Sequence, residues 1–326
     1  MQISSQIVKS LGFVKILKNK FRLCQVTLQL QPLFKRSISY VVKEDADLGD
    51  QVASFGRQHE FADITWYPSQ GKAVYRIDDR ISSNTSGNGQ YDYIPFRSTL
   101  SLELAAVRAT EDAQESLKDP DGKCASAKLI TSTLVNLAYG LTNNGIVFTG
   151  YPIIGYHNRL QSSGTCLDSP EDALITACPW DSRIKDDALD FDMTFYRNKD
   201  PSKPRLYEDI YEEIEQLAVF KYGGLPHWGK NRNLVFNGAL RKYKNAGAFL
   251  RVKEMYDPLG LFSNEWMDQV LGLRGEANIL KEGCALEGLC ICSQDTHCAP
   301  RDGYLCRPGK IYQDARVCAL VSTSEQ

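Results

Sequence analysis

Histidine and lysine lie three positions apart in a segment that favours a turn, and this pair is the strongest chemical feature of the sequence. His227 carries an imidazole that can relay a proton, and Lys230 carries an ammonium that can stabilise developing negative charge. Gly223 and Gly224 free the backbone before the pair, and Pro226 fixes one φ angle. The turn can therefore aim both side chains at one small volume. A His-x-x-Lys pattern also occurs in ordinary surface turns, so the residues alone leave both interpretations open.

An amphipathic helix is expected immediately before this turn. Its apolar stripe recurs at spacings of four, four and three residues, at Leu206, Ile210, Ile214 and Leu217. The acidic residues of the other face are Glu208, Asp209, Glu212, Glu213 and Glu215. Lys221 suits a helix C-terminus, and the two glycines end the helix. A second helix is expected from Tyr243 to Tyr256, so that the turn lies between two helices and is held at both ends.

Three segments of the chain resemble one family of enzymes. The segment His227-Trp228-Gly229-Lys230 and the later Tyr256-Asp257-Pro258-Leu259-Gly260-Leu261-Phe262 resemble the C-terminal signature of the aldonolactone oxidases. These are flavoproteins with a fold of the vanillyl-alcohol-oxidase type. The segment from Glu282 to Cys292 resembles the plant L-gulonolactone oxidases in particular. The resemblance extends from about Gln25 to Cys318 and so covers most of the chain.

The resemblance implies an activity and a site. The activity is FAD-dependent oxidation of L-gulono-1,4-lactone with O2, which gives H2O2 and ascorbate or its precursor. Lys230 and His227 are the implied catalytic residues, with Lys230 close to the isoalloxazine and His227 orienting the ring or relaying a proton. His227, Lys230 and Asn231 would contact the cofactor, and Arg232 would contact the substrate. The protein supplies orientation and electrostatics, whereas the flavin carries the redox step.

The sequence departs from the family in two places. The family binds FAD in an N-terminal domain with a glycine-rich loop, yet the first 24 residues contain a single glycine, Gly12. Relatives also carry a further strand-helix-strand stretch where this chain passes from Lys185 to Asp187. We therefore expect a truncated, internally shortened member whose flavin domain is largely missing and whose activity is impaired. The alternative is a non-catalytic remnant of the cap domain, which acts as a binding or scaffold protein or has no function.

Composition and periodicity predict an α+β fold. With 326 residues, 43% of them hydrophobic, the chain can fill one large or two modest cores. We expect an antiparallel sheet with helices on one face, the cap or substrate domain of the family, built from strands around 25–31, 72–77, 145–150 and 189–197. A helix near 100–115 should cover the sheet. The domains are then a basic segment 1–24, a cap domain 25–283 and a Cys-rich tail 284–326.

Charge and hydropathy limit the partners. The net charge of −2 argues against nucleic acid, which favours a basic patch. No apolar run approaches the roughly 18 residues that a membrane-spanning helix needs. The expected partners are a small aldonolactone and O2. Without a flavin domain, the face that would meet it should be apolar and exposed, which predicts self-association.

The N-terminus is basic and amphipathic. Eight cationic residues precede the first acidic one, Glu44. Apolar residues recur at helical spacing at Ile3, Ile7, Leu11, Val14, Leu17 and Phe21. This pattern is typical of a mitochondrial presequence, whereas Lys15 interrupts the apolar run that a secretory signal requires. We expect mitochondrial targeting, with secretion or no targeting signal as the alternatives.

Cysteines are concentrated in the tail. The six residues concerned are Cys284, Cys290, Cys292, Cys298, Cys306 and Cys318. Their spacing does not fit the paired Cys-x-x-Cys of zinc sites, so we expect no metal. An even number in a short module predicts up to three disulfides, whose pairing the sequence does not fix. Disulfides require an oxidising compartment, which conflicts with a mitochondrial matrix.

Overall fold

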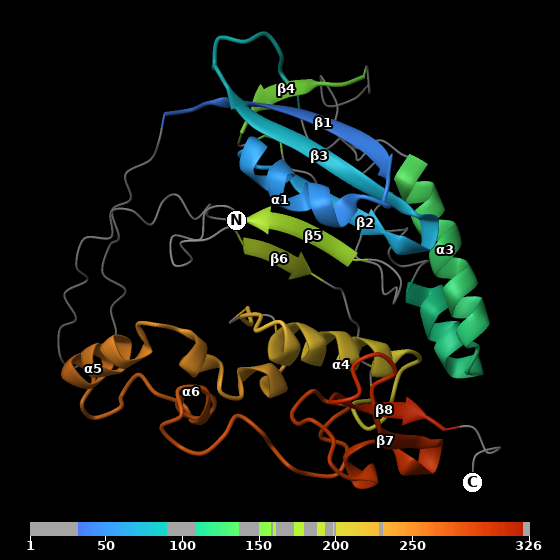
Figure 1. Ribbon diagram of the computed structural model, residues 1–326, viewed down its shortest axis with the longest axis vertical. Helices are drawn as coiled ribbons and strands as arrows, with labels where there is room; N and C mark the ends of the chain where they lie inside the picture. The colour runs from blue at the N-terminus through green and yellow to red at the C-terminus, as the bar shows by residue number, and fades with distance from the viewer. Residues whose placement is uncertain are drawn as a thin grey trace. The chain divides into compact units, whose positions relative to one another are not determined.

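The computed structural model describes residues 32–89, 108–136, 150–157, 159–160, 173–178, 188–192, 198, 200–227 and 231–321. These residues belong to two compact units (Figure 1). Unit 1 comprises Met1–Ala113 and Asp121–Thr194, and unit 2 comprises Gln114–Pro120 and Phe195–Gln326. The domain boundaries expected at 24 and 283 stay predictions. Within the described part of the chain, no helix combines the length and the hydropathy that crossing a membrane requires.

Unit 1 contains a six-stranded antiparallel sheet. Its strands are β1 (Lys35–Glu44), β2 (Asp63–Tyr67), β3 (Lys72–Ile81), β4 (Ile153–Tyr156), β5 (Ala173–Cys178) and β6 (Ala188–Asp192), in the spatial order β4-β1-β3-β2-β5-β6. The strand expected at 72–77 is present and longer, and β6 falls at the start of the one expected at 189–197. The segments 25–31 and 145–149 lie outside the described residues.

One face of this sheet is covered by α1 (Leu48–Gln58) (Figure 1). Val52 and Phe55 of the helix pack with Ile64 of β2 and with Ala73 and Tyr75 of β3. The alternation of side chains along β3 sends these residues to the helix and their neighbours to the opposite face. Unit 1 also contains the short η2 (Pro68–Gln70), a helical segment at 108–113 and nearly all of α3 (Pro120–Asn136). The helical residues 108–117 overlap the helix expected near 100–115.

Unit 2 is built from helices and a small hairpin. The elements are α4 (Glu208–Gln216), the π-helical η3 (Leu217–Lys221), η4 (Asn233–Phe236), η5 (Ala239–Lys242), α5 (Ala246–Tyr256), α6 (Glu265–Val270), η6 (Asp295–His297), η7 (Pro300–Asp302), β7 (Tyr304–Pro308) and β8 (Arg316–Leu320). Both helices expected around the turn are present. Together the two units confirm a mixed fold of helices and antiparallel sheet.

The acidic face of α4 is buried, which its amphipathic pattern did not indicate. Glu212 accepts a hydrogen bond from the backbone N–H of Cys318 at 2.6 Å. Glu213 accepts from the backbone N–H groups of three consecutive residues, 310–312. Gln216 exchanges two hydrogen bonds with the backbone of Arg316, at 2.9 and 3.0 Å. Buried carboxylates need such donors, so this face holds the C-terminal hairpin β7–β8 against α4.

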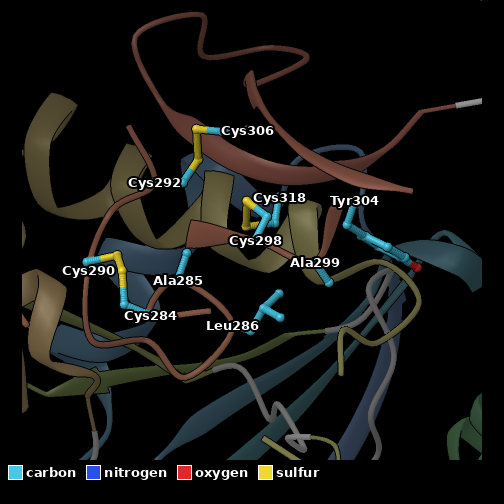
Figure 2. Close-up of a cluster of buried hydrophobic side chains, with 10 residues drawn as sticks. All are labelled: Cys284, Ala285, Leu286, Cys290, Cys292, Cys298, Ala299, Tyr304, Cys306 and Cys318. Atoms are coloured by element: carbon cyan, nitrogen blue, oxygen red, sulfur yellow. A yellow bond between two sulfur atoms is a disulfide. The ribbon is translucent and has the colours of Figure 1, made fainter. Parts of the chain in front are cut away.

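Three disulfides form the core beneath that hairpin (Figure 2). The pairs are Cys284–Cys290, Cys292–Cys306 and Cys298–Cys318. All six cysteines are buried together with Ala285, Leu286 and Tyr304. The prediction of three disulfides in the tail is confirmed, and the structure supplies the pairing that the sequence left open.

Candidate functional site

The predicted catalytic turn lies in unit 2, between η3 and η4. The His227 side chain is exposed, and its backbone N–H donates to Oδ1 of Asn231 while its carbonyl accepts from the Asn231 N–H at 3.2 Å. Asn231 thus closes the turn on itself, and only its amide NH2 group can donate outward. Lys230 falls outside the described residues, so its distance to His227 stays a prediction.

The two glycines end the helix as expected. Gly223 has a φ of +70°, the left-handed conformation that favours glycine at a helix C-terminus. The N–H of Gly224 donates to the carbonyl of Ala218 at 2.8 Å. A Cβ at Gly224 would lie 2.8 Å from that same oxygen, so the close approach requires glycine. The chain therefore leaves the helix in one defined direction.

Lys242 holds the N-terminal side of the turn. Its Nζ donates to the carbonyl of Val219 at 2.6 Å and to that of Gly224 at 2.9 Å. Burial lowers the pKa of this ammonium. The two carbonyls lie on either side of the helix end, so one side chain of η5 ties the last helical turn to the residues that follow it.

Arg232 holds the C-terminal side of the turn. Its guanidinium donates to Oε2 of Glu215 on α4, with Nε at 2.8 Å. Its aliphatic part lies where a Cβ at Gly288 would clash, and Gly288 has a φ of +67°. The structure thus places Arg232, the predicted substrate-binding residue, in a largely buried ion pair. Its contact with substrate stays a prediction.

Two buried carboxyl groups lie beside this ion pair. Burial raises the pKa of Glu212 to about 8, the neighbouring Glu208 adds to the shift and Arg232 opposes it. Burial also raises the pKa of Glu208 to about 7, against a backbone N–H donated by Arg205. These shifts could not be predicted from the sequence, because an acidic helix face is ordinarily exposed to solvent.

A second charged cluster lies on the face of the unit 1 sheet opposite α1. Asp78 is fully buried and receives both Nε and Nη2 of Arg36, and Arg76 pairs with Asp63 at 2.6 Å. His157 stacks on Phe34 at 4.8 Å between ring centroids. Burial lowers the pKa of His157, and the adjacent Arg36 lowers it further. Because its acids and bases pair with one another, we assign this cluster a structural role.

The cysteines and His297 come close enough to suggest a metal site. The candidate sets are Cys284, Cys290 and His297, and Cys292, Cys298 and Cys318. All five of these cysteines are in disulfides, so they offer no thiolate ligand. Nδ1 of His297 accepts from the backbone N–H of Ser293 at 3.3 Å. These cysteines therefore stabilise the module through disulfides.

Comparison with family models finds two matches. Residues 171–270 match the model described as D-arabinono-1,4-lactone oxidase. Residues 281–320 match the C-terminal domain of the model described as L-gulonolactone oxidase 2-like. The first match includes the turn with His227, and the second includes the three disulfides.

Relatives from Arabidopsis thaliana align along most of the chain. Probable L-gulonolactone oxidase 6 is 55% identical over 352 residues, covering 90% of this chain and 58% of that protein. L-gulonolactone oxidase 2 is 54% identical, covering 91% of this chain and 60% of that protein. The protein named probable truncated L-gulonolactone oxidase 7, mitochondrial, is 50% identical over 236 residues, covering 54% of this chain and 94% of that protein.

These alignments also bear on chain length. The chain spans about three-fifths of the length of the first two relatives. The alignment of 352 positions exceeds the 326 residues of the chain, so the first relative has internal residues without a counterpart here. This supports internal shortening, and its place between Lys185 and Asp187 stays a prediction. The chain belongs to the L-gulonolactone oxidase family.

Proposed function

We propose that this chain contributes the cap and the His227 turn to an L-gulonolactone oxidase. The reaction is the oxidation of a secondary hydroxyl of L-gulono-1,4-lactone to a carbonyl, with reduction of O2 to H2O2. The observation that carries the proposal is the identity of 54–55% to proteins named L-gulonolactone oxidase over about nine-tenths of this chain. The family-model matches at 171–270 and 281–320 include the turn and the disulfide module. FAD, implied by the family, would accept two electrons from the hydroxyl carbon and pass them to O2.

The described residues fit one edge of a flavin. His227 is an exposed residue at the tip of a turn whose backbone is held by Asn231. His227 would accept the hydroxyl proton or orient the ring, and the amide NH2 of Asn231 would donate to a ring oxygen. Lys230 would place positive charge beside the reduced ring.

A direct experiment tests the proposal. The purified protein is examined for the visible absorbance band of flavin, before and after incubation with FAD, and peroxide release is then measured with L-gulono-1,4-lactone. D-arabinono-1,4-lactone serves as the second substrate, and catalase confirms that the product is peroxide. Lactone-dependent peroxide that His227→Gln and Lys230→Met both abolish supports the proposal. Peroxide release that neither substitution changes would overturn it.

The alternative is a cap-domain protein without catalysis. The favouring observation is that the chain aligns with 94% of a relative whose name includes the word truncated. In that case the protein binds neither FAD nor lactone, and peroxide release stays at background even with FAD present. The same experiment therefore separates the two functions.

We further propose mitochondrial targeting by residues 1–24. Their basic amphipathic pattern supports this, and one relative is named mitochondrial. Fusion of residues 1–24 to a fluorescent protein should direct it to mitochondria. Replacing Lys9, Lys15, Lys18 and Lys20 with glutamine should abolish import. Unchanged import of the neutralised fusion, or secretion of the original one, would contradict the proposal.

We also propose that the protein self-associates through exposed apolar residues near α5. Met255 is 71% exposed, Leu259 80% and Leu261 70%, and no residue of α5 is buried. Apolar side chains gathered in this way favour association. Size-exclusion chromatography over a range of concentrations should show larger species that Met255→Lys with Leu259→Lys reduces to a monomer. A wild-type monomer at every concentration would contradict the proposal.

A further inference from the structure

The C-terminal end of the helix formed by α4 and η3 leaves backbone carbonyls that need donors. In any helix the last four C=O groups have no partner within the helix. Here the Leu217 carbonyl accepts from Tyr222 and the Ala218 carbonyl from Gly224. The next one, of Val219, accepts from Lys242, whose position in sequence is 23 residues away. A lysine from a different element thus supplies a donor to one of these carbonyls.

The same ammonium also binds beyond the helix. Nζ of Lys242 lies 2.9 Å from the carbonyl of Gly224, which is outside the helix, three residues past its last residue, Lys221. From Gly224, only Leu225 and the buried Pro226 separate this clamp from His227. Proline fixes its own φ angle, so little backbone freedom remains between the clamped carbonyl and the imidazole.

We propose that Lys242 is a positioning residue that sets the direction in which His227 leaves the helix end. Its catalytic meaning rests on the proposed oxidase function, whereas the positioning itself rests on the geometry of this chain. Lys242 does not reach the imidazole. It acts through the carbonyls of Val219 and Gly224, and it holds the N-terminal side of the turn as the pair Arg232–Glu215 holds the C-terminal side.

The residue type suits this task. An ammonium has three donors at one point, so it can bind two carbonyls that converge on it. Its positive charge also lies at the C-terminal end of a helix, where the macrodipole is negative. Lys242 is half-buried and lies three residues after Ala239 in η5. Ala239 is fully buried in the core with Val219 and Phe236. The clamp is therefore anchored in the same core as the helix that it caps.

The test uses the full chain and three substitutions. Lys242→Met removes the donors and the charge, and Lys242→Arg keeps both. Lys244→Met is the matched control, because Lys244 is exposed two positions away. Hydrogen exchange is measured at the amides of Tyr222 and Gly224. The NMR signals of the four histidine rings are recorded in parallel, with His227 assigned from His227→Gln.

The expected results are local. In Lys242→Met, exchange at Tyr222 and Gly224 should accelerate by about tenfold or more, since two charge-assisted hydrogen bonds are lost. The His227 signal should shift or broaden, while those of His59, His157 and His297 stay in place. Lys242→Arg should restore most of the protection, and Lys244→Met should match the wild type.

Two outcomes overturn the proposal. In the first, Lys242→Met lowers the global stability but leaves the exchange at Gly224 and the His227 signal unchanged. Lys242 would then have a structural role only. The other is an equal effect in Lys244→Met. If Lys242→Met does not fold, Lys242→Gln replaces it, because glutamine is neutral and too short to bind both carbonyls. Wild-type exchange at Gly224 in Lys242→Gln would also overturn the proposal.

An activity measurement separates this inference from the proposed function. If the protein oxidises L-gulono-1,4-lactone, Lys242→Met should lower kcat by about tenfold with little change in KM, because the imidazole is misdirected rather than lost. An inactive wild type would sink the oxidase proposal and leave the exchange and NMR results intact. An active wild type with an unchanged kcat in Lys242→Met would sink the positioning role alone.

Discussion

Burial in unit 2 raises the pKa of the Glu212 carboxyl group. Its pKa of about 8 lies above the ordinary value of 4.5, because burial and Glu208 disfavour the charge. The folded state therefore binds more protons than the unfolded state between these two values. The contribution of Glu212 to folding stability is therefore fully present below about pH 4.5 and is lost as pH rises through 8.

We predict that the stability of unit 2 falls between about pH 5 and pH 8. Each unit of pKa difference corresponds to about 1.4 kcal/mol, so the loss should exceed that amount. Glu212→Gln keeps an acceptor for the Cys318 N–H and should flatten most of the slope, with Glu208 contributing the rest. Urea unfolding at both pH values measures the change. Glu282→Gln, at an exposed position, should keep the wild-type slope, and a stability that rises with pH would contradict the prediction.

Gly224 is the second residue whose replacement has a defined effect. A methyl group there would press on the Ala218 carbonyl, so Gly224→Ala should lower the free energy of unfolding by about 1–3 kcal/mol. Gly49 in α1 has open space around its Cβ position, so Gly49→Ala is the matched control and should cost nothing. Thermal unfolding of both variants gives the comparison. Equal stability of the two variants would show that the helix end tolerates a side chain.

Only some of the residues of the candidate site could be predicted from the sequence. The position of His227 after a glycine-ended helix followed from local rules, because Gly223 and Pro226 act on their own backbone. The partners Lys242 and Glu215 could not be predicted. They reach the turn from 18 and 17 positions away, and no local pattern encodes such a contact. The roles expected for Lys230 and Arg232 stay predictions.

At the scale of elements, sequence periodicity found helices better than strands. The apolar spacing of α4 and the stop signal after α5 were clear, whereas the helix α3 and the strands β1, β2, β4 and β5 were not predicted. In β1, residues such as Lys35 and Arg36 are buried by pairing with groups on β3 and the loop after it, so the strand lacks a clean apolar alternation. The burial of the acidic face of α4 could not be predicted for the same reason, because its hydrogen-bond donors come from the backbone of a hairpin that is distant in sequence.

The disulfides of that hairpin differ in their expected contributions. Cys298–Cys318 closes a separation of 20 residues and Cys284–Cys290 one of 6. By loss of chain entropy in the unfolded state, the first disulfide should stabilise the fold by about 3 kcal/mol and the second by about 2 kcal/mol. Replacing Cys298 and Cys318 by alanine should also loosen the Cys318 amide from Glu212. We predict a larger drop in melting temperature for this pair than for Cys284 and Cys290, and the reverse order would contradict the chain-entropy account.

For the whole molecule, the two units have separate cores. The core under α1 belongs to unit 1, and the three described disulfides belong to unit 2. Reduction with an excess of a dithiol should therefore accelerate hydrogen exchange in α4 and β8 and leave β1 and β3 unchanged. Mass-spectrometric exchange of the oxidised and reduced protein measures this. Acceleration in β3 as large as that in β8 would show that the units unfold as one.

Glu213 accepts hydrogen bonds from three successive main-chain N–H groups, and this has a consequence for how the sequence of the tail can change. The carboxylate binds backbone N–H groups, which every residue except proline supplies, so most substitutions at 310–312 should keep these three hydrogen bonds. A neutral residue at 310 would still lose the ion pair between Lys310 and Asp209 of α4, at 3.1 Å. Only two kinds of change should be forbidden there. Proline at 310, 311 or 312 would delete a donated hydrogen, and any side chain at Gly309 would collide with the Tyr312 carbonyl at 2.5 Å and with Cδ of Glu213 at 2.8 Å. A lineage could thus remodel the outer surface of this tail while its attachment to α4 persists.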